Sequence, residues 1–185
     1  MKIGIFGGSF DPPHIGHMMA CLYVLTTTDI QKIWLLPSYR HPFNKNMSSY
    51  EMRVKMCEIS STIFGDKVEV KRFEEELAQN NNGPIYTIDV LRFIRDKFRD
   101  YTFYLVIGSD ILNEIERWKE YNKIEDYAKI LILIRRGVDP AEDYKAILPD
   151  ISSTLIRENI QKGIPITGLV CKNVIKFIEE NELYK

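Results

Sequence analysis

Cysteine is scarce in this sequence, and the few cysteines present exclude two kinds of scaffold. Cys21, Cys57 and Cys171 are odd in number, lie far apart and form no C-x-x-C pair. This pattern excludes a disulfide framework and a cysteine-based zinc site, and it is typical of a reducing compartment. We therefore expect a cytoplasmic protein.

Long apolar runs and an excess of one charge are also missing. The longest apolar stretch, Ile130–Ile134, is far shorter than the ~20 residues of a membrane span. The early run Ile3–Phe6 is too short for the apolar region of a signal peptide. The 25 Lys and Arg residues nearly balance the 26 Asp and Glu residues, for a net charge of −1. Because nucleic-acid and membrane-surface binders usually carry a basic excess, we expect neither partner.

Several common motifs of phosphate binding and hydrolysis are absent as well. There is no G-x-x-x-x-G-K-[ST] loop and no G-x-G-x-x-G turn, which disfavours a P-loop NTPase and a Rossmann dehydrogenase. Neither a G-x-S-x-G nucleophile elbow nor an H-E-x-x-H zinc motif is present. Any phosphate chemistry must therefore rest on a different arrangement of residues.

What is present is a regular alternation of short β-branched runs and longer amphipathic segments. The 185 residues correspond to one domain at about 150 residues per domain, and the alternation indicates a mostly parallel α/β sheet. We expect one domain over residues 1–185, in a Rossmann-like, doubly wound fold of about five or six strands with helices on both faces. The candidate strands are Lys2–Phe6, Lys32–Leu36, Val68–Val70, Thr102–Ile107 and Ala128–Ile134.

Apolar residues at helical spacing predict the helices between and after these strands. They begin near Gly16, at Thr87, at Ile111, at Ser153 and near Lys172. The last two make residues 150–185 a helical C-terminal segment. The segments expected to be irregular are Pro37–Ser49, Ala78–Pro84 and Gly137–Pro149.

The strongest functional signal follows the first predicted strand, where the chain reads GGSFDPPHIGH. Ligands of open α/β sheets bind at the carboxyl ends of strands. The adjacent Gly7 and Gly8 allow close backbone approach and present N–H donors to an anion. His14 and His17, three apart at a helix start, can point to the same side. Together these residues favour a polyphosphate site.

Each of these residues has an ordinary alternative when it is taken alone. A glycine pair is often only a tight turn, and a histidine at a helix start is often a cap. Asp11 before Pro12 is typical of a turn. The complete string in its place after the first strand nevertheless favours the functional interpretation.

The string also resembles a known signature. It is similar to the (T/H)xGH motif of the nucleotidyltransferase superfamily, and in its full form to the bacterial nicotinate-nucleotide adenylyltransferases. The resemblance continues in the same order along the whole chain. The segments concerned are Pro84–Leu91 (P-S-Y-T-x-D-T-L), Ile107–Asp110 (I-G-x-D), Arg135–Gly137 (R-x-G) and Ile151–Arg157 (I-S-S-T-x-I-R).

Two segments depart from the pattern of that family. Ile85 stands where the family has a small serine, a change that can alter the pyridine pocket. The loop after the second strand lacks the family's P-P-H-[KR] sequence, and Lys45 is preferred over Arg40 as its basic residue.

The resemblance implies an enzyme of NAD biosynthesis that transfers the adenylyl group of ATP to nicotinic acid mononucleotide, giving deamido-NAD and pyrophosphate. It implies His14, His17 and Arg157 as catalytic residues. Contacts to the mononucleotide would come from Tyr86, Thr87 and Trp118. Contacts to ATP would come from Gly7, Gly8, Ser9, Phe10, Lys45, Gly108, Asp110, Ser152, Ser153 and Thr154. Mg²⁺ is implied as the counter-ion of ATP, with no metal site built from protein residues alone.

This chemistry suits the residue types present. A phosphate monoester has a second pKa near ~6, so the acceptor phosphate is already largely ionised and needs no side-chain base. Alignment and charge neutralisation on the triphosphate remain for the protein to supply. Structural alternatives stay open for Ser152 and Asp110 as helix caps, and for Trp118 as a core residue.

Other functions are compatible with parts of the same sequence. His14–His17 also matches the HIGH string of class I aminoacyl-tRNA synthetases, but the chain is short for such an enzyme and is not basic. An adenylyltransferase for nicotinamide mononucleotide or pantetheine phosphate is a nearer alternative. A third is a nucleotide-binding regulator without catalysis.

Overall fold

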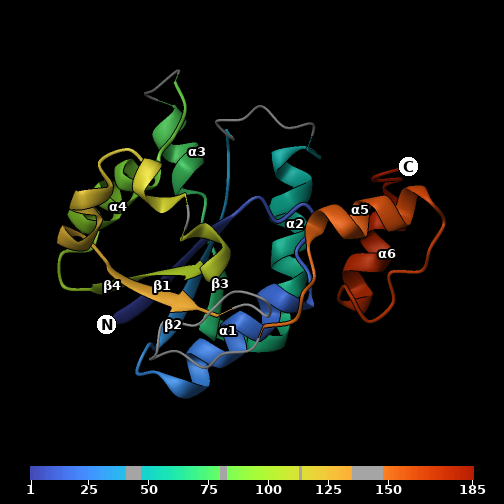
Figure 1. The fold of residues 1–185 in the computed structure, drawn as a ribbon, viewed down its shortest axis with the longest axis horizontal. Coiled ribbons are helices and arrows are strands. Elements are labelled where there is room, and N and C mark those ends of the chain that lie inside the picture. The colour runs from blue at the N-terminus through green and yellow to red at the C-terminus, as the bar shows by residue number, and fades with distance from the viewer. Residues whose placement is uncertain (41–46, 80–82, 113, 135–147) are drawn as a thin grey trace.

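The computed structural model describes residues 1–40, 47–79, 83–112, 114–134 and 148–185. Five parallel strands form one sheet in the order β3-β2-β1-β4-β5. This confirms the predicted parallel α/β fold (Figure 1). The strands are β1 (Lys2–Gly8), β2 (Lys32–Pro37), β3 (Val68–Val70), β4 (Thr102–Gly108) and β5 (Lys129–Leu133).

The strand order places a topological switch point beside the first strand. β1 pairs with β2 on one side and with β4 on the other, so the chain winds outward in both directions from β1. In such sheets the connections leave the carboxyl ends of the two central strands in opposite directions and open a crevice there. The glycines that end β1 and β4, Gly8 and Gly108, therefore lie at the expected ligand-binding edge.

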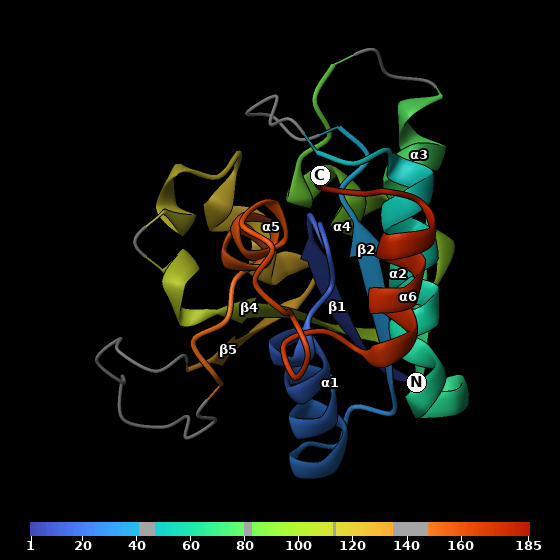
Figure 2. The same cartoon turned by 90° about the vertical axis from the view of Figure 1, so that its right-hand side faces the viewer.

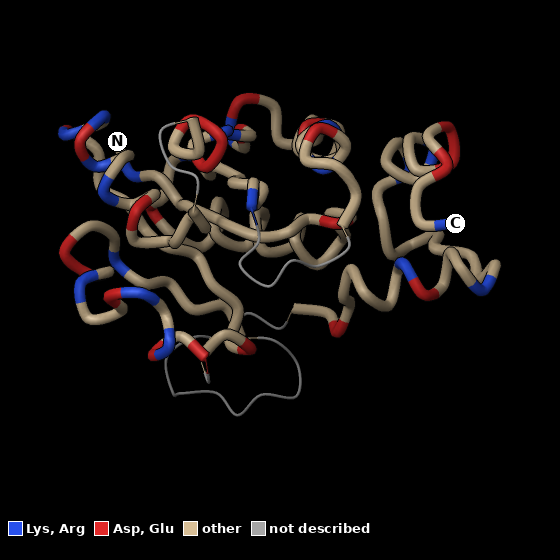
Figure 3. The backbone as a smooth tube through the Cα atoms, turned by 90° about the horizontal axis from the view of Figure 1, so that it is seen from above, with Lys and Arg blue, Asp and Glu red and all other residues tan. Residues whose placement is uncertain are grey.

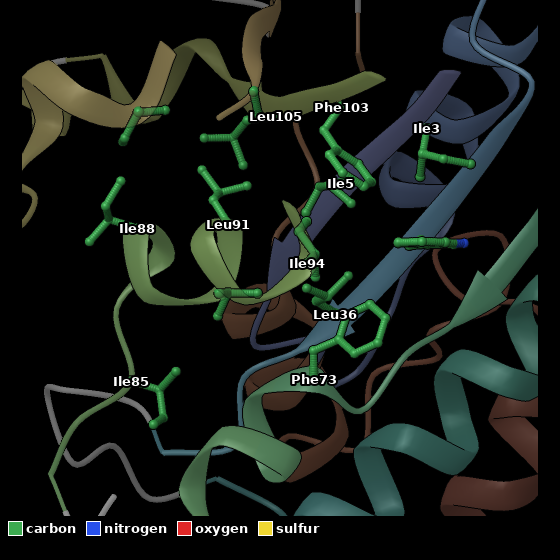
Figure 4. Close-up of a cluster of buried hydrophobic side chains, with 14 of the residues drawn as sticks. Ile3, Ile5, Leu36, Phe73, Ile85, Ile88, Leu91, Ile94, Phe103 and Leu105 are labelled. Carbon is green, nitrogen blue, oxygen red and sulfur yellow. The ribbon is translucent and has the colours of Figure 1, made fainter. Parts of the chain in front are cut away.

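One face of the sheet is covered by helices α3 (Phe73–Ala78) and α4 (Thr87–Lys97). The apolar residues of α4 recur at i, i+3 and i+6, so Ile88, Leu91 and Ile94 all point into the core and are almost fully buried. Figure 4 shows them packed against strand residues such as Ile5 and Leu105.

The opposite face is covered by helices α1 (Ile15–Thr27) and α2 (Tyr50–Ser61). Met18, Cys21 and Val24 lie on one side of α1 and pack against the sheet, as their helical spacing predicts. Helices on both faces confirm the doubly wound arrangement.

The C-terminal segment packs against the outer side of α2. Helices α5 (Ser153–Gln161) and α6 (Lys172–Glu180) share a hydrophobic cluster with Met56 of α2. Both figures show α6 beside α2, and Figure 1 shows α5 and α6 at the opposite end of the molecule from α4. Within the described residues, no helix has the length and apolar character needed to cross a membrane.

The predicted helix from Ile111 to Trp118 is wrong. The chain instead forms short 3₁₀ helices at Ser109–Ile111, Ile115–Arg117 and Tyr121–Asp126. The apolar residues face the core as expected, but their spacing fits a 3₁₀ turn as well as an α-helix. Periodicity alone could not distinguish the two.

The sequence pattern did not predict helices α2 and α3. The inward side of α2 includes Arg53 and Ser60, both almost completely buried, so no continuous apolar stripe marks it. The first turn of α3 holds Glu74, Glu75 and Glu76, a composition that resembles a solvated loop.

Candidate active site

The turn after β1 has a strained backbone that brings the ring of Phe10 against Gly8. Phe10 is almost completely buried and has a φ of 49°, an unfavourable value for a residue with a side chain. A Cβ atom on Gly8 would lie 3.2 Å from the Phe10 ring. A side chain at this position would therefore push the Phe10 ring back by a few tenths of an ångström, and strain like that at Phe10 is typical of ligand-binding turns.

His14 and His17 lie at the start of α1, at the end of this turn. The backbone N–H of His14 donates to Nδ1 of His17 at 3.1 Å. Because that nitrogen accepts a hydrogen bond, the neutral ring carries its proton on Nε2. The local backbone thus fixes both the orientation and the tautomer of His17.

The start of α5 is attached to the same turn. Oγ of Ser153 donates to the carbonyl of Pro12 at 2.8 Å, and Nη1 of Arg157 donates to the carbonyl of Asp11 at 2.8 Å. Ser152 acts as the N-cap of α5, since its Oγ accepts from the backbone N–H of Leu155. Ser152 therefore has the helix-capping role that was its structural alternative. Ser153 instead donates its hydroxyl proton to the turn.

These elements surround a cavity of about 340 Å³ at the carboxyl ends of β1 and β4. All three residues expected to be catalytic line this cavity, and so do nine of the ten expected ATP contacts. They are His14, His17 and Arg157, with Gly7, Gly8, Ser9, Phe10, Gly108, Asp110, Ser152, Ser153 and Thr154. Residues from three distant parts of the sequence, 7–17, 108–110 and 152–157, are thus brought to one place.

At the end of β4, Gly108 makes room for Asp110. A Cβ atom on Gly108 would lie 2.3 Å from Oδ1 of Asp110, so only glycine permits this position of the carboxylate. Asp110 is exposed and lies inside the 3₁₀ turn Ser109–Ile111, whose N-cap is Gly108. Asp110 therefore does not have the helix-capping position that was its alternative.

A smaller cavity of about 60 Å³ lies next to the first and shares with it Gly7, Val106 and Ile107. Thr87, at the start of α4, lines this second cavity. Glu74 of α3 also lines it and accepts a hydrogen bond from the backbone N–H of Tyr39 at 2.7 Å. Burial raises the pKa of the Glu74 carboxyl to about 7.

The other two residues expected at the mononucleotide lie outside the described lining of both cavities. The ring of Tyr86 is exposed and faces the ammonium group of Lys119, 4.9 Å from the ring centroid. Trp118 is half-buried and packs against the core cluster under α4. Its core alternative is therefore supported by the packing.

The departure at Ile85 has a different consequence from the one expected. Ile85 is buried in the core cluster (Figure 4) and is not among the described residues that line either cavity. Its apolar side chain thus stabilises the approach to α4. The expected basic residue Lys45 and the segment Arg135–Gly137 lie outside the described residues.

Arg53 and Asp11 are the site residues that sequence reasoning missed. Arg53 is only 2% exposed, and its guanidinium donates to the carbonyls of Ser9 at 2.9 Å, Ser38 at 2.7 Å and Ser48 at 3.1 Å. It therefore ties the first turn to the end of β2. No sequence signal marked it, because α2 itself was not predicted.

The cysteines are poor candidates for nucleophiles. Cys21 and Cys57 are fully buried, and burial raises the pKa of the Cys21 thiol to about 12. Since the thiolate is the reactive form, neither is activated near neutral pH.

Figure 3 shows basic and acidic positions interspersed along the described chain, so the positive groups of the site are a local feature.

A glycine-rich turn, two histidines and a helix N-terminus around one cavity at the switch point define a nucleotide-binding α/β protein of the nucleotidyltransferase class. The sequence profile described as cytidylyltransferase-like matches residues 5–159. The chain belongs to the cytidylyltransferase-like family.

Curated relatives are similar to the chain over its full length. A protein of Myxococcus xanthus named "Probable nicotinate-nucleotide adenylyltransferase" is 34% identical over 184 residues, covering 100% of this chain and 95% of the relative. A protein of the same name from Bacillus licheniformis is 31% identical and covers 100% of this chain and 98% of the relative. The expected resemblance is thus confirmed.

A solved structure shares the fold. Nicotinic acid mononucleotide adenylyltransferase of Plasmodium falciparum, complexed with NaAD, has a TM-score of 0.82 against this chain. The two are 23% identical, and the match covers 99% of this chain and 97% of that one.

Proposed function

We propose that this protein is a nicotinate-nucleotide adenylyltransferase, which joins the adenylyl group of ATP to nicotinic acid mononucleotide and releases pyrophosphate. The observation that carries the proposal is the cavity at the switch point. It combines a glycine turn, the His14–His17 pair and Arg157 at one ligand-binding edge. The names of the full-length relatives support the same reaction.

The chemistry needs little from the protein beyond alignment and charge. A phosphate oxygen of the mononucleotide attacks the α-phosphorus of ATP and forms the new P–O bond. The bond from that phosphorus to the bridging oxygen breaks, and its electron pair leaves with pyrophosphate. Because the attacking phosphate is already largely ionised, fixed donors around the triphosphate are the main source of acceleration.

The residues of the first cavity supply those donors. We assign His17 Nε2–H and His14 to the phosphates, since both lie at the N-terminus of α1 where a helix favours anions. Arg157 adds a permanent charge, and its planar fork suits phosphate oxygens. Asp110 and Gly108, at the end of β4, are assigned to the nucleoside part of ATP.

The second cavity is assigned to the pyridine end of the mononucleotide. It lies on the other side of Gly7 from the ATP cavity and is lined by Thr87 at the N-terminus of α4. N–H groups at a helix start can bind a carboxylate. The cavity itself is small, so we assign to it the ring substituent rather than the whole ring.

We further propose that Mg²⁺ accompanies ATP. Hard cations prefer phosphate oxygens, so the triphosphate of ATP would hold the ion. The ion would neutralise charge on the leaving pyrophosphate. We also propose a cytoplasmic location, in line with three cysteines that form no disulfide pattern.

The experiment that tests the function is pyrophosphate release from ATP and Mg²⁺ with a panel of acceptors. The panel is nicotinic acid mononucleotide, nicotinamide mononucleotide, pantetheine phosphate and buffer alone. We expect rapid release with the first, together with formation of the deamido dinucleotide in equal amount. Release with pantetheine phosphate alone would assign a different adenylyltransferase, and ATP binding without release would indicate a nucleotide-binding regulator.

A further inference from the structure

The carboxylate of Asp11 is the centre of a buried network that joins three parts of the chain. Asp11 is 1% exposed although it is charged. It accepts hydrogen bonds from the backbone N–H and the Oγ of Ser48, which precedes α2, and from the hydroxyl of Tyr184 at 2.6 Å. A carboxylate this well buried is stable only when such donors surround it.

Tyr184 follows α6 and reaches this carboxylate from the far end of the sequence. Its hydroxyl lies 2.6 Å from Oδ1 of Asp11 and 3.3 Å from Oγ of Ser48. Burial and the hydrogen bond to Asp11 raise the pKa of this phenol well above its usual value, so it remains a proton donor.

The backbone near this contact has unfavourable conformations at two residues, Glu182 and Tyr184. Tyr184 has a φ of 66° and Glu182 a φ of 51°, both in the left-handed region that disfavours residues with side chains. Such strain persists only where surrounding contacts over-determine it. At Tyr184 the hydrogen bond to Asp11 is one such contact, whereas Glu182 belongs to the turn that ends α6, where the N–H of Leu183 donates to the carbonyl of Ile178.

The other side of Asp11 faces the reacting groups. Asp11 lines the ATP cavity, its carbonyl accepts from Arg157, and the carbonyl of the next residue, Pro12, accepts from Ser153. His14 follows after Pro13. The turn from β1 to α1 is therefore held by its backbone from α5 and by its one carboxylate from Tyr184 and Ser48.

We propose that Tyr184 is a positioning residue for adenylyl transfer, which acts through Asp11 to hold this turn in the shape that the ATP phosphates need. The inference rests on the proposed function of the same cavity. Among the described residues the hydroxyl of Tyr184 bonds to Asp11, Ser48 and Met56 and to no residue assigned to the substrates, so its loss should affect alignment in the transition state more than the binding of ATP.

The test is a double-mutant cycle with Tyr184→Phe and Asp11→Asn, each assayed well below its melting temperature. Tyr184→Phe keeps the ring in its cluster and removes only the donor. We expect kcat to fall about tenfold, the rate equivalent of one charge-assisted hydrogen bond, with the KM for ATP within about twofold. In the Asp11→Asn background the same change should cost only about two- to threefold, because the amide oxygen still accepts from Tyr184 but no longer carries a charge.

Two matched variants serve as controls. Tyr23→Phe makes the same chemical change in α1, and Lys185→Ala alters the residue after Tyr184, which pairs with Glu182. Both should retain wild-type kcat. If Tyr184→Phe does not fold, Asp11→Asn is tested alone. It must then lower kcat while the KM for ATP stays within about twofold of the wild-type value.

The outcomes separate the two proposals. A folded Tyr184→Phe protein with wild-type kcat would overturn the positioning role, and so would a loss that is equally large in the Asp11→Asn background. A wild-type protein that releases no pyrophosphate with any acceptor would instead contradict the proposed function.

Discussion

The imidazole rings of His14 and His17 are stacked, with their centroids 3.7 Å apart and their planes inclined by 29°. His17 also contacts the ring of Phe10, 4.9 Å between centroids. The pair is thus held by the ring of Phe10 in the strained turn and by the backbone N–H of His14, which donates to Nδ1 of His17. Such preorganisation lets fixed donors stabilise a developing charge without reorganising during the reaction.

Replacement of either histidine should lower turnover while the protein remains folded. A hydrogen bond to a charged group is worth about 1.5–3 kcal/mol, so loss of one from the transition state costs roughly 10- to 150-fold in kcat. His17→Ala should also lower the melting temperature slightly, since His17 accepts from the N-cap backbone. Met19→Ala, at an exposed position of the same helix, is the control. Near-normal turnover in folded His17→Ala protein would refute the phosphate assignment.

Arg157 should act through both its charge and its planar fork. Arg157→Lys keeps the charge but loses the planar fork whose two terminal nitrogens donate separately to the Asp11 carbonyl and the Thr154 hydroxyl. We expect Arg157→Ala to lose on the order of a hundredfold in kcat/KM and Arg157→Lys to recover only part of that loss. Lys162→Ala, near the exposed end of α5, should match the wild type. If Arg157→Ala and Arg157→Lys were both as active as Lys162→Ala, residues 152–157 would have only the structural role of a capped helix start.

Gly16 offers a test of His14 that leaves the histidine in place. A Cβ atom at Gly16 would lie 3.0 Å from Nδ1 and 3.1 Å from Cε1 of His14. Alanine is otherwise favourable inside a helix by about 0.5–1 kcal/mol. Gly16→Ala should therefore lower kcat roughly tenfold without lowering the melting temperature. In a His14→Ala background the same change should have no further effect on kcat, and a further loss there would show that it acts by another route.

Glu74 should make stability depend on pH in an unusual direction. Burial raises its pKa to about 7, while Tyr39 N–H and the charge of Arg53 favour ionisation. Below the unfolded pKa of ~4.3 the group is neutral in both states. Between that value and pH 7 the unfolded chain ionises the group while the folded protein still keeps it protonated, so a cost of about 3–4 kcal/mol develops and then persists at higher pH.

Glu74→Gln should remove this cost. The amide oxygen can still accept from Tyr39, so the variant should gain stability over the wild type at pH 8 and little at pH 4.5. Urea denaturation at both pH values measures the difference. Glu76→Gln, on the same helix and paired with Lys97 in the folded state, should show no such gain at pH 8. An equal effect of Glu74→Gln at both pH values would contradict the raised pKa.

The sequence predicted those parts of the molecule that depend on local patterns. The five strands and helices α1 and α4 follow from apolar periodicity, and the glycine turn with its histidines was visible as a contiguous string. Arg53, Asp11 and Tyr184 could not be connected in this way. Their relationship depends on how α2 and the C-terminal segment pack, and a buried polar network has no periodic signature.

Ile85 illustrates the converse error. A departure from a family motif suggested a changed pocket, yet the side chain points into the core beneath α4. Which way a residue faces at a helix start depends on the approach of the preceding loop. The motif gives the position of a residue but not the direction of its side chain.

The last prediction concerns the acceptor. Nicotinic acid mononucleotide should be preferred over nicotinamide mononucleotide below about pH 7, since donors at the start of α4 suit a carboxylate and would be left unpaired by an amide NH₂ group. The Glu74 carboxyl in the same cavity is compatible with that anion while it stays protonated, and burial raises its pKa to about 7. Buried unpaired groups cost about 1–3 kcal/mol each, so two mismatches give a preference on the order of a hundredfold in kcat/KM. The position of Ile85 in the core, away from both cavities, removes one reason to expect a different preference. Steady-state rates with both mononucleotides at one pH below about 7 decide the question, with Thr87→Val as the variant that removes a hydroxyl donor and should narrow the ratio. A wild-type ratio near one would show that this protein retains the chemistry of its family but not the acceptor specificity.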